Sequence, residues 1–257
     1  MKTKHTLSFS SIITLTFLSF SFCDSKGAKN ENNQPMNDKG FVVVELFTSE
    51  GCSSCPAADE TIIRLAKEFP ERVYFLGYHV DYWDYIGWKD EFGSAEYTKR
   101  QNRYAEVLKL NSIYTPQAIV NGEKELVGSR ENQLRSIIQE KLKTEPVATI
   151  GLSVNKSDSN NITVAYKLAD AGKILLNIAL VQIMATTNVK RGENDGRTLN
   201  HINIVRNFKS FSINKDADFK TGFKIPAGLT SKDLKVIAFV QNEKNMKITG
   251  ASEAAIQ

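Results

Sequence analysis

The sequence has few cysteines and no strong excess of charge of one sign. Only 3 of its 257 residues are cysteine, and so few cannot replace a hydrophobic core in a chain this long. A miniprotein held together by disulfides is therefore excluded. Lys and Arg number 33 against 29 Asp and Glu, a formal net charge of +4. That balance gives no electrostatic reason to expect nucleic acid as a partner.

An apolar run long enough to span a bilayer is also missing at the N-terminus. Residues 7–22 carry no charge, but the stretch is shorter than the roughly 20 apolar residues a spanning helix needs, and it is rich in Ser and Thr. The composition is nevertheless that of a folded protein, with 41% hydrophobic and 24% charged residues, which excludes wholesale disorder. A chain of this length indicates one or two domains.

The N-terminus has the pattern of an export signal. Two lysines precede the short apolar run, so residues 1–22 are predicted to be a signal peptide. Cys23 follows directly and resembles the lipobox cysteine of bacterial lipoproteins, which becomes a diacylated N-terminus, although Phe22 stands where a small residue is usual. Plain cleavage near Cys23 and an incidental cysteine are the alternatives. Residues 23–39 almost lack large apolar side chains and are predicted to be a flexible tether. The predicted location is the periplasm or cell envelope, with Cys23 as lipid anchor.

A pair of cysteines lies between a predicted strand and a predicted helix. Residues 41–47 (FVVVELF) are typical of a strand buried on both faces. Cys52-Ser-Ser-Cys55-Pro56 follows, and apolar residues then recur at helical spacing. Pro56 suits a first helical turn. Residues 73–80 form a second apolar strand, so the three elements predict a parallel pair joined by a right-handed crossover.

This position favours redox chemistry. Free N–H groups at a helix start stabilise a thiolate, so Cys52 is the predicted exposed nucleophile and Cys55 the resolving thiol. The pair would act through a mixed disulfide with a partner. Half of a zinc site is an alternative, but the chain has no second Cys-x-x-Cys. A static structural disulfide is the other, although so short a loop constrains the unfolded chain little.

Further residues are candidates for the same site. Glu45, within the first strand, is a candidate acceptor for the proton of the resolving thiol, or a structural glutamate at a sheet edge. Thr115 and Pro116 directly precede a short strand, which Pro116 can begin but not occupy centrally. His79 ends the second strand and is a candidate metal ligand with the two cysteines, or a hydrogen-bonded structural residue.

An aromatic segment follows the second strand. Trp83 and its aromatic neighbours precede a helix predicted over 94–110. These side chains either line a groove for a partner, with Trp83 binding substrate, or cover a local core.

The second half of the chain has a different pattern. From residue 146 onward, short alternating segments separated by turn residues predict an antiparallel β-sandwich. The charged, glycine-rich loop at 190–197 is either a ligand or domain contact or a solvated hairpin loop. The predicted division is 1–22 signal peptide, 23–39 tether, 40–145 first domain and 146–257 β domain.

The order of these motifs resembles the thioredoxin superfamily. That resemblance implies an α/β thioredoxin-like domain with a helical insertion, followed by an all-β, sandwich-like C-terminal domain. It also implies that Pro116 is a cis-proline facing the dithiol, that Thr115 offers its backbone to a substrate peptide, and that Glu45 is the buried acid. The blocks VVVELFTSEGCSSCPAAD, HVDYWDYIGWKD, YTPQAIVNG and RGENDGRTLNHINIVR resemble, across residues 41–251, a family of exported bacterial proteins known as a secreted domain of unknown function.

The leading hypothesis is an exported thiol–disulfide oxidoreductase that acts on protein or small-molecule thiols and disulfides. It requires no cofactor. A copper or zinc carrier that uses Cys52, Cys55 and His79 is one alternative. A non-catalytic module that holds a partner is the other.

Overall fold

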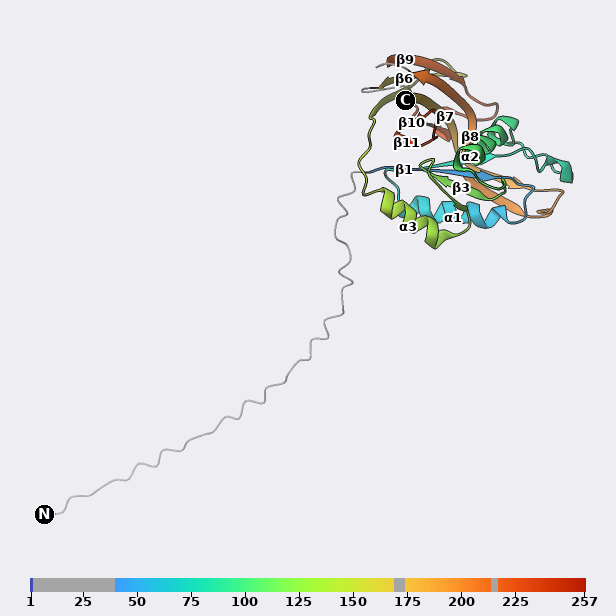
Figure 1. Ribbon diagram of the computed structural model, residues 1–257, viewed down its shortest axis with the longest axis horizontal. Helices are drawn as coiled ribbons and strands as arrows, with labels where there is room; N and C mark the ends of the chain where they lie inside the picture. The colour runs from blue at the N-terminus through green and yellow to red at the C-terminus, as the bar shows by residue number, and fades with distance from the viewer. Residues whose placement is uncertain (2–39, 169–173, 214–216) are drawn as a thin grey trace. The chain divides into compact units, whose positions relative to one another are not determined.

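The computed structural model describes residues 1, 40–168, 174–213 and 217–257 (Figure 1). The predicted signal peptide, the tether and Cys23 lie outside the described residues, except for Met1. Within the described ranges the helices are α1 (Cys55–Glu68), η1 (Asp84–Ile86), α2 (Ala95–Leu108), α3 (Glu131–Lys141) and η2 (Ser231–Asp233). None of these helices is long and apolar enough to cross a membrane. The strands are β1 (Val42–Thr48), β2 (Val73–His79), β3 (Gln117–Val120), β4 (Lys124–Val127), β5 (Ile150–Lys156), β6 (Asn161–Leu168), β7 (Ile174–Asn188), β8 (Thr198–Ile213), β9 (Ala217–Lys224), β10 (Leu234–Asn242) and β11 (Ile248–Ala255).

One large mixed sheet runs through both halves of the chain. Its strand order is β11-β10-β7-β8-β2-β1-β3-β4, and a smaller sheet has the order β5-β6-β9. The crossover through α1 makes β1 and β2 parallel, as their sequences predict. β8 lies beside β2, also parallel, with Gly77 opposite Ile204. The long β7–β8 hairpin therefore brings the second half of the chain next to the first.

The expected fold, a thioredoxin-like domain followed by a separate β-sandwich, is wrong. Four strands of the second half (β7, β8, β10 and β11) continue the sheet of β1–β4, and β5, β6 and β9 form the small sheet. The alternation of apolar residues indicates which side chains share a face, but not which strand lies next. An apolar β2 left at the edge would expose unpaired backbone groups, and β8 covers part of that edge.

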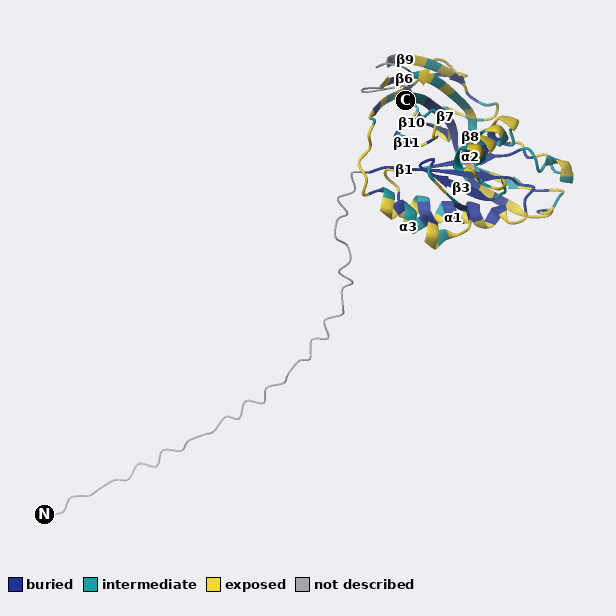
Figure 2. Cartoon of the chain, viewed as in Figure 1, coloured by how far each residue is buried: buried dark blue, intermediate teal, exposed yellow. Residues whose placement is uncertain are grey.

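The large sheet is buried on both faces at β1, where all seven residues are buried. Alternate residues of β1 point to opposite sides, so Val42, Val44 and Leu46 pack with α1 and α3 in one cluster. Val43 and Phe47 join a second, aromatic cluster that includes Tyr97 and Tyr104 of α2. Figure 2 accordingly shows β1 and β3 buried and the outer faces of α1 and α3 exposed.

The sheet curls around the aromatic cluster. β11 is one edge strand and β3 lies next to the other edge. Even so, the N–H of Ile248 donates to the carbonyl of Asn121, directly after β3, at 2.9 Å. The small sheet packs on the outer side of β7 and β10 through residues such as Val164, Ile178 and Val236. The pairing of β8 with β2 places the β7–β8 turn near the start of α1 (Figure 1).

Candidate functional site

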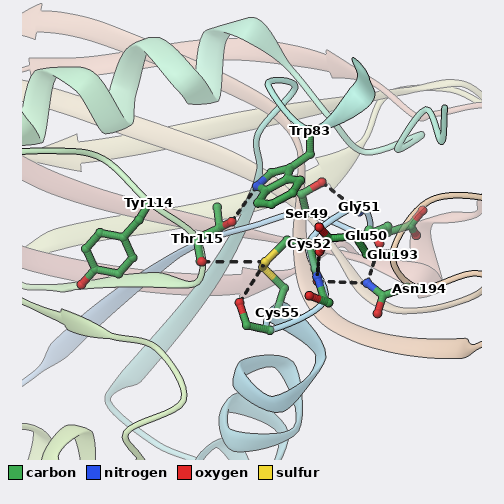
Figure 3. Close-up of a disulfide and its surroundings, with 12 residues drawn as sticks. Ser49, Glu50, Gly51, Cys52, Cys55, Trp83, Tyr114, Thr115, Glu193 and Asn194 are labelled. Carbon is green, nitrogen blue, oxygen red and sulfur yellow. Dashed lines mark hydrogen bonds between the residues drawn. A yellow bond between two sulfur atoms is a disulfide. The ribbon is translucent and has the colours of Figure 1, made fainter. Parts of the chain in front are cut away.

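The two cysteines lie where β1 leads into α1. Cys52 ends a turn in which its N–H donates to the Ser49 carbonyl, and the N–H of Cys55 donates to the Cys52 carbonyl. The helix begins at Cys55, with Pro56 in its first turn. Cys52 and Cys55 form a disulfide with their Cα atoms 5.4 Å apart (Figure 3).

Both sulfur-bearing side chains are buried. Cys52 is 1% exposed and Cys55 0%, whereas the two intervening serines are exposed. The structure therefore does not show Cys52 as the exposed nucleophile that its position predicts. A partner sulfur reaches Cys52 only if some of the covering groups move.

Thr115 and Trp83 meet at the dithiol. The Thr115 carbonyl oxygen lies 3.7 Å from the Sγ of Cys52, and the bond between Thr115 and Pro116 is cis. Trp83 Nε1 donates to Thr115 Oγ1 at 2.8 Å, and in Figure 3 its indole lies beside Cys52. Tyr85, 81% exposed, stacks on Trp83. The structure thus brings Thr115, Pro116 and Trp83 to the cysteine pair and leaves the side chain of Tyr85 open to solvent beside Trp83.

Glu45 is not brought to the dithiol. Its side chain lies on the face of the sheet away from α1, where Arg100 Nε donates to Glu45 Oε1 at 2.6 Å and the Tyr104 hydroxyl donates to Glu45 Oε2. Burial opposes the charged guanidinium, but the Glu45 carboxylate outweighs it and raises the pKa of Arg100. The charge in the apolar strand belongs to a buried ion pair with α2, on the wrong face to take a proton from Cys55.

His79 pairs with a carboxylate and not with the cysteines. Its Nδ1 lies 2.7 Å from Asp90 Oδ2, and both side chains are essentially buried. Burial opposes the Asp90 carboxylate, but the charge and hydrogen bond of His79, together with backbone N–H donors from Glu50 and Phe92, lower the pKa of Asp90. Among the described residues, no three His, Cys, Asp or Glu side chains are grouped so that they could hold a metal ion.

Sequence reasoning missed a second histidine, which lies beside His79 and between two acids that flank the cysteines. His201, on β8, is 2% exposed, with its Nε2 3.4 Å from Glu50 Oε1 and its Nδ1 3.2 Å from Asp59 Oδ2. Burial opposes the charged ring, but the carboxylates of Asp59 and Glu50 outweigh it and raise the pKa of His201 to about 10. The sequence signals were two acids close to the cysteines and the family-like block at 191–206, which contains His201.

The β7–β8 loop holds the cysteine loop directly. The side-chain amide of Asn194, fully buried, donates to the carbonyls of Glu50 and Cys52 at 2.8 and 2.9 Å. The N–H of Ser53 donates to Glu193 Oε2 at 3.0 Å, and hydrogen bonding by the Ser53 side chain and by this N–H lowers the pKa of Glu193. Figure 3 shows this loop against the turn that carries Cys52. Of the two readings of residues 190–197, the structure supports a contact with the first half of the chain.

The chain belongs to the family described as Protein of unknown function (DUF1223), whose model matches residues 43–241. The expected relationship to a domain of unknown function is confirmed. A crystal structure of a protein from Agrobacterium tumefaciens is 28% identical and covers 82% of this chain and 92% of that chain, with a TM-score of 0.65. A domain of the outer membrane lipoprotein Omp28 from Porphyromonas gingivalis is 11% identical over 43% of this chain and 88% of that chain. Its TM-score of 0.28 is too low to carry an argument. No curated protein matches the chain.

Proposed function

We propose that the chain is a thiol–disulfide oxidoreductase whose reactive pair is Cys52 and Cys55. The observation that carries the proposal is the contact of the Cys52 sulfur with the Thr115 carbonyl, 3.7 Å away, at the start of a helix. An extended segment of a partner would bind the Thr115 backbone beside this sulfur, and the free N–H groups of α1 favour a thiolate in the reduced form.

The reaction is a two-step exchange. In the reducing direction, the Cys52 thiolate attacks one sulfur of a partner disulfide, and the other partner sulfur leaves as a thiolate that takes up a proton. The Cys55 thiolate then attacks the Cys52 sulfur, which restores the Cys52–Cys55 disulfide and releases the second partner sulfur. Two electrons pass to the partner, a protein or small-molecule disulfide, which is reduced to two thiols. The oxidising direction is the same sequence reversed.

Burial of the pair makes access the decisive question. Since Cys52 is 1% exposed, the first step requires groups beside the sulfur to move. Trp83 is one of these groups, and its ring stacks on the solvent-exposed ring of Tyr85. A pair that no thiol can reach would be a structural disulfide instead. A redox-active pair and a structural disulfide therefore differ in the rate at which a thiol reduces the disulfide.

The test is exchange with glutathione and with a reduced protein substrate, using the purified full chain. We expect turnover in the wild type, none in Cys52→Ser, and trapped mixed disulfides in Cys55→Ser. Cys23→Ser is the matched control, since it removes a cysteine outside the described site. A wild-type pair that neither reagent opens or closes would contradict the proposal.

We also propose that the protein is exported and anchored to a membrane by a lipid on Cys23. The support is the basic start, the short apolar run and the cysteine that follows it. Mass spectrometry of the N-terminus in the native host should find a diacylated Cys23, and Cys23→Ser should release the protein from the membrane fraction. A mature protein cut elsewhere and free of lipid would refute the anchor while leaving the redox proposal intact.

A further inference from the structure

His201 connects the two segments that carry the cysteines. Glu50 lies two residues before Cys52 in the turn after β1, and Asp59 lies on α1, one helical turn beyond Cys55. The imidazole of His201 stands between these carboxylates, 3.4 Å from Glu50 and 3.2 Å from Asp59. A side chain of β8 therefore makes the contact between the entry and the exit of the cysteine loop.

The cluster is shielded from solvent. The side chains of Glu50, His201 and Asp59 are 0%, 2% and 10% exposed. The cavity that touches His201 and Asp59 measures about 10 Å³, at the lower limit of what holds one water molecule. Charges in such surroundings are weakly screened, so the protonation state of one ring acts strongly on its neighbours.

The groups that face His201 come from β2, from the segment before α2 and from the two carboxylate-bearing segments, while β7 places Ala185 opposite it. β2 presents His79, whose ring centroid is 4.9 Å from that of His201 and which pairs with Asp90 from the segment before α2. That segment also supplies the ring of Phe92 and the indole of Trp88, whose N–H donates to Glu50 Oε2 at 2.7 Å. Within the described ranges, its ion-pair partners are the two carboxylates already named. His201 is thus the cation that directly contacts both.

The geometry points to His201 as a positioning residue that sets the reduction potential of the Cys52–Cys55 pair, an inference that rests on the proposed function. Two carboxylates and one imidazolium leave one net negative charge beside the pair, and loss of the imidazolium leaves two. An added negative charge disfavours a thiolate on Cys52. When the reduced form of the pair is less stable, the pair accepts electrons less readily and is a weaker oxidant.

The test compares charge-balanced variants of the full chain. The redox equilibrium with glutathione and the pKa of Cys52 are both measured by mass spectrometry of the peptide that contains the pair, the pKa from alkylation at a series of pH values. We expect His201→Gln to shift the equilibrium toward the disulfide by about tenfold, which is about 30 mV, and to raise the Cys52 pKa. Asp59→Asn added to His201→Gln restores the net charge and should reverse both shifts. Lys209→Gln removes a positive charge from the same strand away from the pair and should change neither.

The outcomes separate the two proposals. An unchanged equilibrium and pKa in His201→Gln, or no reversal on adding Asp59→Asn, overturns the role of His201. If His201→Gln does not fold, Asp59→Asn alone tests the same charge effect and should shift both quantities in the opposite direction, and no shift there overturns it. A wild-type pair that fails to exchange with glutathione contradicts the oxidoreductase proposal, while alkylation of the chemically reduced protein still decides the role of His201.

Discussion

Asn194 donates a hydrogen bond to the carbonyl of Cys52 at 2.9 Å, although the two residues lie 142 positions apart. The same amide also donates to the carbonyl of Glu50. A loop from the second half of the chain therefore holds the backbone of the cysteine turn, and the site is built from both halves.

Asn194→Ala should destabilise the protein and loosen this turn. Both carbonyls lose a buried donor, which costs about 1–3 kcal/mol of unfolding free energy, and the oxidised pair should be reduced faster by dithiothreitol. Urea unfolding and the reduction rate measure the two effects. Asn200→Ala is the matched control, because Asn200 is exposed on β8 and bonds only Thr186 among the described contacts. Equal effects of the two variants on stability and on reduction rate would show that the hydrogen bonds of Asn194 do not hold the cysteine turn.

The stability of the oxidised protein should depend on pH through His201. Its pKa in the folded state, about 10, lies above the unfolded value of about 6.5, so the folded state binds the extra proton. The stability this provides is fully present below pH 6.5 and is lost as the pH rises through 10. The excess unfolding free energy of the wild type over His201→Gln should accordingly shrink across that window. A difference that stays constant from pH 6 to pH 10 would contradict a charged His201.

Trp83 should control access to Cys52 through its bond to Thr115. Trp83→Phe keeps an aromatic ring but loses the 2.8 Å hydrogen bond, at a cost of about 0.5–1.5 kcal/mol. We expect faster reaction of the pair with glutathione. Thr115→Val removes the acceptor, so the double variant should be scarcely less stable than either single one. If the stability losses of the two single variants simply add in the double variant, Trp83 and Thr115 are not coupled through this hydrogen bond.

Patterns within short segments of the sequence predicted the strand–helix–strand unit that carries the two cysteines. An apolar strand, Cys52-x-x-Cys55 before Pro56 and a helical repeat define the strand–helix–strand unit without reference to distant residues. The position of Thr115 followed from a family resemblance, because nothing in its own segment indicates a sulfur neighbour. The helix predicted over 94–110 is also present, as α2.

Partners far along the chain could not be predicted. Asn194 and His201 reach the cysteine loop only because β8 pairs with β2, and that pairing depends on how the whole sheet forms. The residue types in the 190–197 loop and at His201 do not indicate that β8 pairs with β2. The separate sandwich was wrong for the same reason, since the alternation in β7 and β8 fits a shared sheet equally well.

Glu45 shows the same limit within a single strand, and it leads to a last prediction. An acid in an apolar run indicates a buried carboxyl, but its partner Arg100 lies 55 residues away on α2. Arg100→Met should leave that carboxylate buried and unpaired, with a loss on the order of 3–5 kcal/mol.

Replacing both partners, as Glu45→Leu with Arg100→Met, should recover part of this loss, because neither buried charge remains. Unfolding in urea measures both variants. The rate of glutathione exchange at Cys52 should stay close to that of the wild type in the double variant, since the ion pair lies on the opposite face of the sheet from α1. A large fall in that rate with stability recovered would instead return Glu45 to the proton path of the dithiol.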